Sequence, residues 1–321
     1  MTAGDRRLND RSVSRMSNGK AVPFGEPAAM LDLAAQVAGG IAPPDPAITE
    51  AARAAAPLLA SLPPAQLRHT VEKVIMGKAL GAGLQWMHDA GVLATVLPEL
   101  DATVDFSQEG GRRHKDVWEH TKQVVLQSVP SPIVRWAALL HDIGKVRTRV
   151  MLPDGKVTFH RHAEVGARMW EPIAKRLAFD KPERHQIRFL ILHHLRANAY
   201  EPSWTDAAVR RFDHEMGEHL DNLLELSCAD VTSRRPGRRE EAIRNIEALR
   251  QRILAIRVLD ARVPPLPAGL GNAIMEAFAI PPSKRIGDLR KLCEDAIERG
   301  ELEERREADY YLAYLRKSGA V

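Results

Sequence analysis

A His-Asp doublet, His141-Asp142, stands at the end of the apolar segment WAALLHDIGK, and further histidine and aspartate residues flank it at long range. The flanking candidates are His120, His162, His194 and Asp230. Imidazole nitrogens and carboxylate oxygens are common ligands of divalent metals. A metal held by such residues can turn water into a nucleophile at neutral pH. The pattern therefore points to metal-assisted hydrolysis.

Two forms of this site are compatible with the sequence. A single ion would be held by His120, His141, Asp142 and Asp230. Adding His162 and His194 would allow two ions, with Asp142 as a shared bridge. The neighbouring His160 and His193 compete for the same two positions, and only the register of the helices decides between them. Such ligands accept Mn, Ni, Co, Fe or Mg, so the residue types do not distinguish the ion.

The elements that must position these residues are predicted to be helices, because apolar residues recur at i, i+3, i+4 and i+7 through most of residues 114–257. Further helices are expected near residues 163–178, 182–196, 205–216, 218–232, 238–258 and within 271–316. Only RVMLPDGKVTFH predicts strands, with Asp154-Gly155 as a hairpin turn. Lys145 follows His141 by four residues, so we expect it on the same helix face, where its charge can neutralise a bound phosphate.

Composition places the chain among globular proteins. It has 321 residues, of which 45% are hydrophobic and 27% charged. We expect a disordered basic tail (1–27), a helical subdomain (28–105), the domain with the metal site (112–258) and a small C-terminal helical subdomain (268–317). No apolar run approaches the ~20 residues that span a bilayer, and the start lacks the apolar core of a secretory signal. Two distant cysteines suggest no disulfide framework, so a cytoplasmic location is expected.

The net charge of +4 is mildly basic and permits a phosphate-rich partner. Arginines are dense just after Asp230, where they can form a stripe that binds RNA phosphates; these are Arg234, Arg235, Arg238 and Arg239. The alternative is a solvated helix with pairs such as Glu240–Arg244. Further basic residues can surround the mouth of the site or serve only solubility, as loop arginines often do: Arg112, Arg113, Arg147, Arg149 and Arg161.

The order of His120, His141-Asp142 and Asp230 resembles the HD superfamily of metal-dependent phosphohydrolases. The segments HKDVWEHT, FHRHAEVGA, LHHLR, CADVTSRRPGRREEAIRN and IMEAFAIPPSKRIGDLR are similar to the HD-containing C-terminal body and tail of bacterial CCA-adding tRNA nucleotidyltransferases and the related poly(A) polymerases. LPPAQLRHTVEKVIMGKALGAGLQWMHDAGVLATVLPEL is similar to the helical segment before that domain. The resemblance covers roughly residues 30–316 and implies an all-α fold with an HD core.

The resemblance implies roles for individual residues. The four ligands of a single ion would be those of the signature order, with His162 and His194 added in the two-metal form. His194 is preferred over His193 because HLR aligns with the family's His-apolar-Arg. Asp142 and Lys145 would be the catalytic residues, Lys145 as the cation that faces the phosphate. The implied mechanism is attack of metal-bound hydroxide on phosphorus in a nucleotide or an RNA end.

One feature of those relatives has no counterpart in this sequence. They begin with a nucleotidyltransferase head that carries a Gly-Ser loop and a paired carboxylate motif, whereas Asp5, Asp10 and Asp32 have no predicted β-sheet to hold them. We therefore expect a phosphohydrolase, and no nucleotide addition by this chain alone. The alternatives are a tRNA-binding module, the body half of a split CCA-adding enzyme with a separate nucleotidyltransferase subunit, or a metal that only stabilises the fold.

Overall fold

The computed structural model describes residues 26–106, 116–233, 235–262 and 264–321. Within these ranges the secondary structure is helical except for one two-stranded antiparallel hairpin. The all-α fold class with one short β-hairpin is therefore confirmed. The predicted disordered tail, residues 1–27, falls almost wholly outside the described residues.

The chain divides into two compact units. The first comprises Met1–Arg196 and Asp221–Arg239, and the second comprises Ala197–Leu220 and Glu240–Val321. Each unit therefore draws on two separate stretches of sequence. The domain boundaries expected near residues 105–112 and 258–268 stay predictions.

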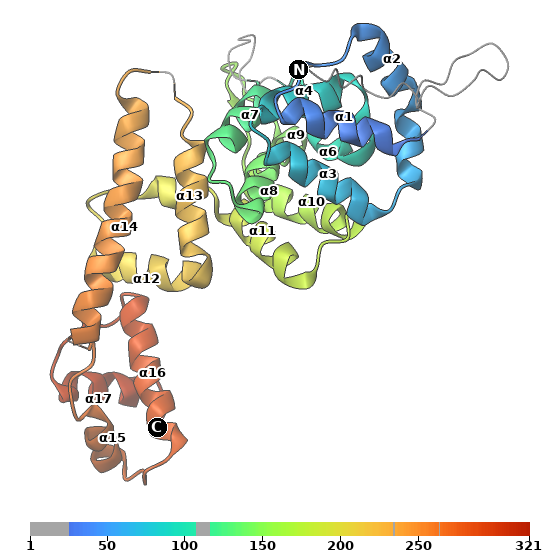
Figure 1. Cartoon of the computed structure of the whole chain (residues 1–321). Coiled ribbons are helices and arrows are strands. Elements are labelled where there is room, and N and C mark those ends of the chain that lie inside the picture. Colours follow the sequence, from blue (N-terminus) through green and yellow to red (C-terminus); the bar gives the residue numbers. More distant parts are fainter. Residues whose placement is uncertain (1–25, 107–115, 234, 263) are drawn as a thin grey trace, which may run out of the picture. The chain divides into compact units, whose positions relative to one another are not determined.

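The first unit contains two sets of helices (Figure 1). The N-terminal set consists of α1 (Ala28–Ala38), α2 (Pro46–Ala55), the 3-10 helix η1 (Ala56–Ser61), α3 (Pro64–Ile75), α4 (Leu80–Asp89), α5 (Val92–Val96) and α6 (Pro98–Asp101). The set that carries the candidate site consists of α7 (Val117–Gln127), α8 (Pro132–Leu140), α9 (Lys145–Thr148), α10 (His162–Arg176), α11 (Lys181–His193) and α13 (Leu220–Asp230).

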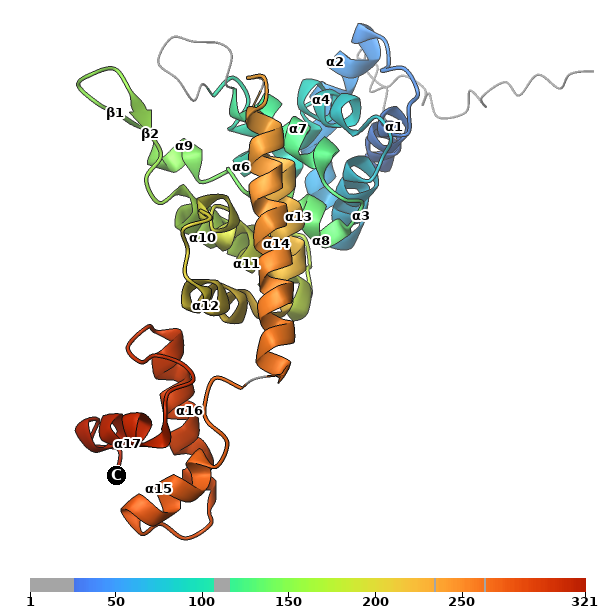
Figure 2. The ribbon, with the colours of Figure 1, turned by 90° about the vertical axis from the view of Figure 1, so that its left-hand side faces the viewer.

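Between α9 and α10 lies the hairpin, β1 (Val150–Met151) paired with β2 (Val157–Thr158). Figure 2 shows it extending from α9. Gly155 has φ +78°, a conformation that glycine adopts without strain, as the predicted Asp154-Gly155 turn requires. The hairpin thus forms part of the connection between the doublet and His162, the first residue of α10.

Local sequence signals define where the helices of this unit begin. Proline occupies the first turn of α2, α3, α6, α8 and α11, where its missing N–H costs nothing. The Asp116 carboxylate accepts a hydrogen bond from the backbone N–H of Trp118 at 2.7 Å and caps α7. Asp180 and Glu183 form a reciprocal capping box at the start of α11. These caps set the register of helices that carry candidate ligands.

Polar contacts join the two sets of helices within the first unit. The buried Arg135 of α8 donates from Nη1 to the carbonyl oxygen of Ile75 at 2.6 Å, at the end of α3. The next residue, Trp136, donates its indole N–H to Glu72 at 3.1 Å. Because α8 leads directly into the His-Asp doublet, these bonds anchor the element that presents the doublet.

The second unit contains η2 (Ala197–Ala199), α12 (Asp206–Met216), η3 (Gly217–His219), most of α14 (Arg238–Arg262), α15 (Leu270–Phe278), α16 (Lys284–Glu298) and α17 (Ala308–Lys317). Helices α15–α17 enclose a small core that includes Leu270, Ile274, Cys293 and Tyr311. Arg257 of α14 pairs with Asp213 of α12 at 2.6 Å. The predicted C-terminal helical group is thus present, with a hydrophobic core of its own.

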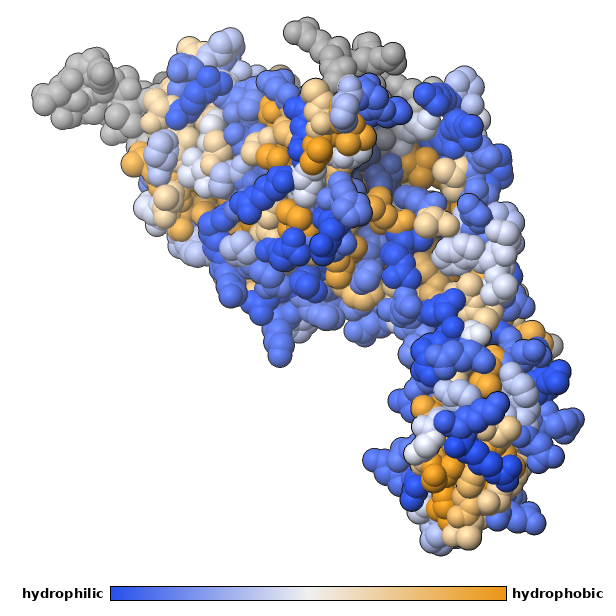
Figure 3. All heavy atoms as spheres, turned by 180° about the vertical axis from the view of Figure 1, so that it is seen from behind, coloured by the Kyte–Doolittle hydropathy of each residue, from blue (hydrophilic) through white to orange (hydrophobic). Residues whose placement is uncertain are grey.

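Polar side chains predominate on one face of the molecule. Figure 3 shows one face of the molecule, on which hydrophilic residues predominate and hydrophobic ones form small groups. None of the helices in the described ranges combines the length and the apolar character needed to cross a lipid bilayer.

Candidate metal centre

The six residues singled out as metal ligands lie together in the first unit, and each is placed at or near the end of an element. His120 lies in α7, and the doublet occupies the turn that follows α8. His162 is the first residue of α10, His194 follows the last residue of α11, and Asp230 ends α13. Their polar atoms form two groups: His120, His141 and Asp230, and Asp142, His162 and His194.

In the first group the Nε2 atoms of His120 and His141 are 3.2 Å apart. Asp230 Oδ1 lies 3.0 Å from the Nε2 of His120 and 3.5 Å from that of His141. In the described ranges, three donor atoms from three helical elements therefore converge on one point.

In the second group the Nε2 atoms of His162 and His194 are also 3.2 Å apart. Asp142 connects this group to the first. Its Oδ1 lies 3.4 Å from His162 Nε2, while its Oδ2 lies 3.1 Å from His141 Nε2. The two oxygens of one carboxylate thus face the two groups, which is the arrangement that a bridging ligand needs.

In each of the four histidines the other ring nitrogen, Nδ1, forms a hydrogen bond with an oxygen. The backbone carbonyl three residues earlier accepts from Nδ1 in His141 (2.8 Å), His162 (2.9 Å) and His194 (2.8 Å). In His120 the partner of Nδ1 is the hydroxyl of Thr232, at 3.0 Å. A carbonyl can only accept, so Nδ1 carries the proton in those three rings, and a neutral ring then presents a bare Nε2 lone pair to the centre.

This donor set fits a divalent cation. Two bare nitrogens 3.2 Å apart repel each other unless a proton or a cation lies near both. Metal-bound histidines almost always donate their other ring N–H to an oxygen, which orients the ring and fixes its tautomer. Nitrogen and carboxylate ligands together suit divalent first-row metals. The residues that would hold the ions are the six predicted from the sequence.

The electrostatics of the centre follow from burial and from the opposite charges. Burial lowers the pKa of His194 to about 4 and also lowers the pKa of His162. Burial acts in the same direction on His141, but the carboxylates of Asp142 and Asp230 outweigh it and raise its pKa to about 10. Although burial raises the pKa of both carboxyl groups, the neighbouring histidines hold these pKa values well below the usual range. The carboxylates thus stay ionised, as metal ligands must be.

Lys145 and Gly144 complete the surroundings of the doublet. Helix α8 ends at Leu140, so Lys145 does not continue the same helix as the sequence pattern suggested, but begins the short helix α9. The turn between them still brings its Nζ to 2.7 Å from Asp142 Oδ2. A Cβ on Gly144 would lie 2.1 Å from the carbonyl oxygen of His162, so this glycine lets the turn pack directly against the start of α10.

The competing histidines lie elsewhere. His160 is exposed in the loop before α10. The ring of His193 packs against Phe189, with the centroids 4.3 Å apart. Helix register thus brings His162 and His194 into the groups. Sequence reasoning missed Thr232 as the partner of His120; its place two residues after Asp230, in LSCADVTSR, is the only signal that could have found it.

The predicted arginine stripe is described only in part. Arg234, like Arg112 and Arg113, lies outside the described residues. Arg239 donates from Nε to the carbonyl oxygen of Val231 at 3.3 Å, beside the end of α13, whereas Arg235 and Arg238 are exposed. Phosphate binding by these residues stays a prediction.

Comparison with known proteins identifies the segment that carries the centre. Residues 115–235 match the family model of the HD domain. The chain carries an HD domain. Ahead of the HD domain, residues 44–103 match a model described as the probable RNA and SrmB-binding site of polymerase A. The resemblance predicted from the sequence motifs is confirmed by both matches.

Two of the curated relatives are tRNA nucleotidyltransferases. The chain is 30% identical over 250 residues to the A-adding tRNA nucleotidyltransferase of Deinococcus radiodurans, covering 76% of this chain and 56% of that protein. It is 28% identical over 259 residues to the CC-adding enzyme of Thermus thermophilus, covering 78% and 56%. A multifunctional CCA protein of Alkalilimnicola ehrlichii is 33% identical over 117 residues, covering 35% and 27%. The chain thus spans about half the length of the first two relatives.

Proposed function

We propose that this protein is a metal-dependent phosphohydrolase that acts on a phosphoester of a nucleotide or of an RNA end. The observation that carries the proposal is the pair of His/Asp groups joined by Asp142, in which all four imidazoles have Nδ1 bonded to an oxygen and Nε2 turned to the centre. A single structural ion would not require one carboxylate to face two groups of donors. The arrangement therefore favours hydrolysis over a purely structural role for the metal.

Each residue has a role in this reaction. Divalent ions bound here would supply Lewis acidity to a phosphate oxygen and lower the pKa of water. Asp142 would place the two groups at a fixed separation, and the carbonyl bonds to Nδ1 would keep the rings from turning. Lys145, at the edge of the centre, would offer its ammonium group to the charge that develops on a phosphate oxygen.

The test is hydrolysis by purified protein loaded in turn with Mn, Ni and Co. The substrates are a generic phosphodiester, 2′,3′-cyclic nucleotides and nucleoside monophosphates. We expect at least one class to be cleaved, and Asp142→Asn to lower the rate by roughly a thousandfold, since it removes the charge of a shared ligand. Asp154→Asn, an exposed aspartate of the hairpin, is the matched control. No cleavage of any substrate, or equal rates in Asp142→Asn, would overturn the proposal.

A second function is favoured by the match of residues 44–103 to an RNA-binding model and by the tRNA nucleotidyltransferase relatives. In this reading the chain binds tRNA, either as a module or together with a separate nucleotidyltransferase subunit. Its signature is tRNA affinity that falls with salt and survives Asp142→Asn, or co-purification with a nucleotidyltransferase polypeptide. Absence of tRNA binding at low salt would exclude it.

A further inference from the structure

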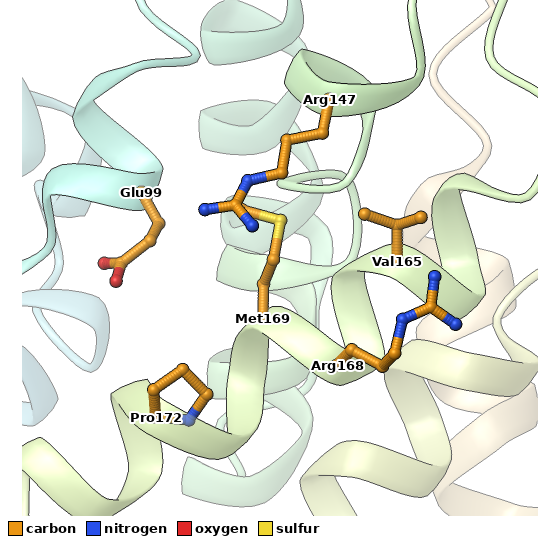
Figure 4. Close-up of a pocket in the computed structure, with 6 residues that line it drawn as sticks. All are labelled: Glu99, Arg147, Val165, Arg168, Met169 and Pro172. Atoms are coloured by element: carbon orange, nitrogen blue, oxygen red, sulfur yellow. The ribbon is translucent and has the colours of Figure 1, made fainter.

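A surface pocket lies within the first unit, lined in part by residues of α9 and α10. Its volume is about 250 Å³, and it is lined by Glu99, Arg147, Val165, Arg168, Met169 and Pro172. Figure 4 shows the Arg147 guanidinium group extending over Met169 towards Glu99, with Arg168 beside Val165. The wall is therefore partly apolar, and it includes two exposed arginines, Arg147 and Arg168.

The positive charges of this pocket have no ion-pair partner among the residues that the structure describes. Glu99, its only acidic lining residue, is already engaged by Arg176, which donates to its two carboxylate oxygens at 3.0 and 2.7 Å. Arg147 and Arg168 have no side-chain hydrogen bond or ion pair with any residue that the structure describes. In the described part of the chain, no carboxylate thus neutralises these two positive groups.

This arrangement differs from that of three other arginines in the described residues. Arg68, Arg210 and Arg257 each meet carboxylates in paired geometry. A planar guanidinium group is suited to bind phosphate through two parallel hydrogen bonds. Two unpaired groups beside an apolar wall therefore favour a ligand that has both a phosphate and a less polar part, as a nucleotide does.

The pocket is close to the candidate metal centre along the chain. Arg147 follows Lys145 by two residues in α9, and Val165 follows His162 by three residues on α10, one helical turn away. Glu99 belongs to α6, within the segment that matches the RNA-binding model. The pocket thus lies where α6 meets the helices of the HD domain.

We propose that this pocket binds a backbone phosphate of single-stranded RNA, with Arg147 and Arg168 as its two cationic contacts. The apolar side chains of Val165, Met169 and Pro172 receive the sugar of the same nucleotide. The inference rests on the proposed function, because a strand held here places a neighbouring phosphoester at the metal centre. It adds a substrate class, an RNA strand longer than one nucleotide.

The experiment measures RNA binding without hydrolysis. A fluorescein-labelled single-stranded oligoribonucleotide is titrated with the full chain in EDTA over a range of KCl concentrations, and binding is followed by anisotropy. For single strands, each phosphate contact contributes about 0.7 to the slope of log affinity against log salt. Because both arginines contact one phosphate, we expect the double variant Arg147→Ala/Arg168→Ala to reduce that slope by about 0.7 and to weaken binding at low salt by roughly tenfold or more.

The control is Lys175→Ala. It removes an exposed positive charge from α10, the helix that carries Arg168, but Lys175 does not line the pocket. An unchanged slope in the double variant, an equal loss in Lys175→Ala, or displacement of the oligonucleotide by an equal concentration of mononucleotide would overturn the inference. RNA binding that depends on Arg147 and Arg168 in a protein that cleaves no phosphoester would support the pocket and overturn only the proposed function. Hydrolysis by the unaltered chain, together with unchanged RNA binding in the double variant, would support the proposed function and overturn the pocket.

Discussion

Gly144 allows the turn that holds the doublet to approach the start of α10, so Gly144→Ala tests how the centre is built. The added Cβ would lie 2.1 Å from the carbonyl oxygen of His162 and 2.7 Å from the backbone nitrogen of Gly166. Ordinary contact begins near 3.4 Å, so the backbone must separate by more than 1 Å. The φ of Gly144 is −65°, which any residue can adopt. The requirement for glycine is therefore one of space.

The expected cost follows from this overlap. Overpacking costs about 1–3 kcal/mol, and because both blocking atoms belong to the backbone we expect the upper end, about 3 kcal/mol. In a unit of this size that lowers Tm by roughly 6–12 °C. Because His162 moves with its carbonyl, we also expect metal held by Asp142, His162 and His194 to be lost before metal held by the other group.

Thermal unfolding and metal content of the same preparations measure both effects. Gly81→Ala is the matched control, since a Cβ there meets nothing within 4 Å and the position is helical. We expect it to leave metal content unchanged and to stabilise the chain by up to about 1 kcal/mol. A Gly144→Ala protein with the Tm and the metal content of the unaltered chain would refute the reasoning.

Three further predictions concern other parts of the chain. Burial raises the pKa of the Cys293 thiol to about 11, so at pH 8 only about one thiol in a thousand is ionised. Ellman's reagent should therefore label Cys293 only after unfolding, and rapid labelling of the folded chain would contradict this. Arg135→Met leaves the carbonyl oxygen of Ile75 without its donor and should lower the free energy of unfolding, measured in urea, by about 1–3 kcal/mol. An unchanged urea midpoint would count against that hydrogen bond. Tyr311→Phe removes a hydroxyl that donates to the Glu303 carbonyl at 2.9 Å, and should cost about 1 kcal/mol in the second unit, with no change in metal content.

Much of the fold was open to prediction from local sequence, because helix periodicity and turn residues act over short distances. The helices of residues 114–257 and the Asp154-Gly155 turn follow from such signals. The division into two units does not, because residues 197–220 and 221–239 are consecutive in sequence yet fall in different units. That division depends on contacts between distant segments, which no local pattern encodes.

In the candidate site, too, the residue types could be predicted from the sequence, whereas their positions depend on the fold. The types and order of the six candidate ligands could be predicted, because metal chemistry requires them. The choice of His162 over His160 depends on where α10 begins, and the oxygen partners of Nδ1 depend on tertiary packing. Thr232 and Arg168 carried no motif, so only the structure places Thr232 beside His120 and Arg168 in the wall of the pocket.

The count of bound metal ions per chain tests the central claim most directly. The chain purified without chelator, reloaded with Mn and passed through gel filtration should retain two ions, as the two His/Asp groups predict. Asp142→Ala should lose ions, because its two oxygens face both groups, while Asp154→Ala should keep both. A chain that retains no ion, or an Asp142→Ala variant with the same count as the unaltered protein, would contradict the account.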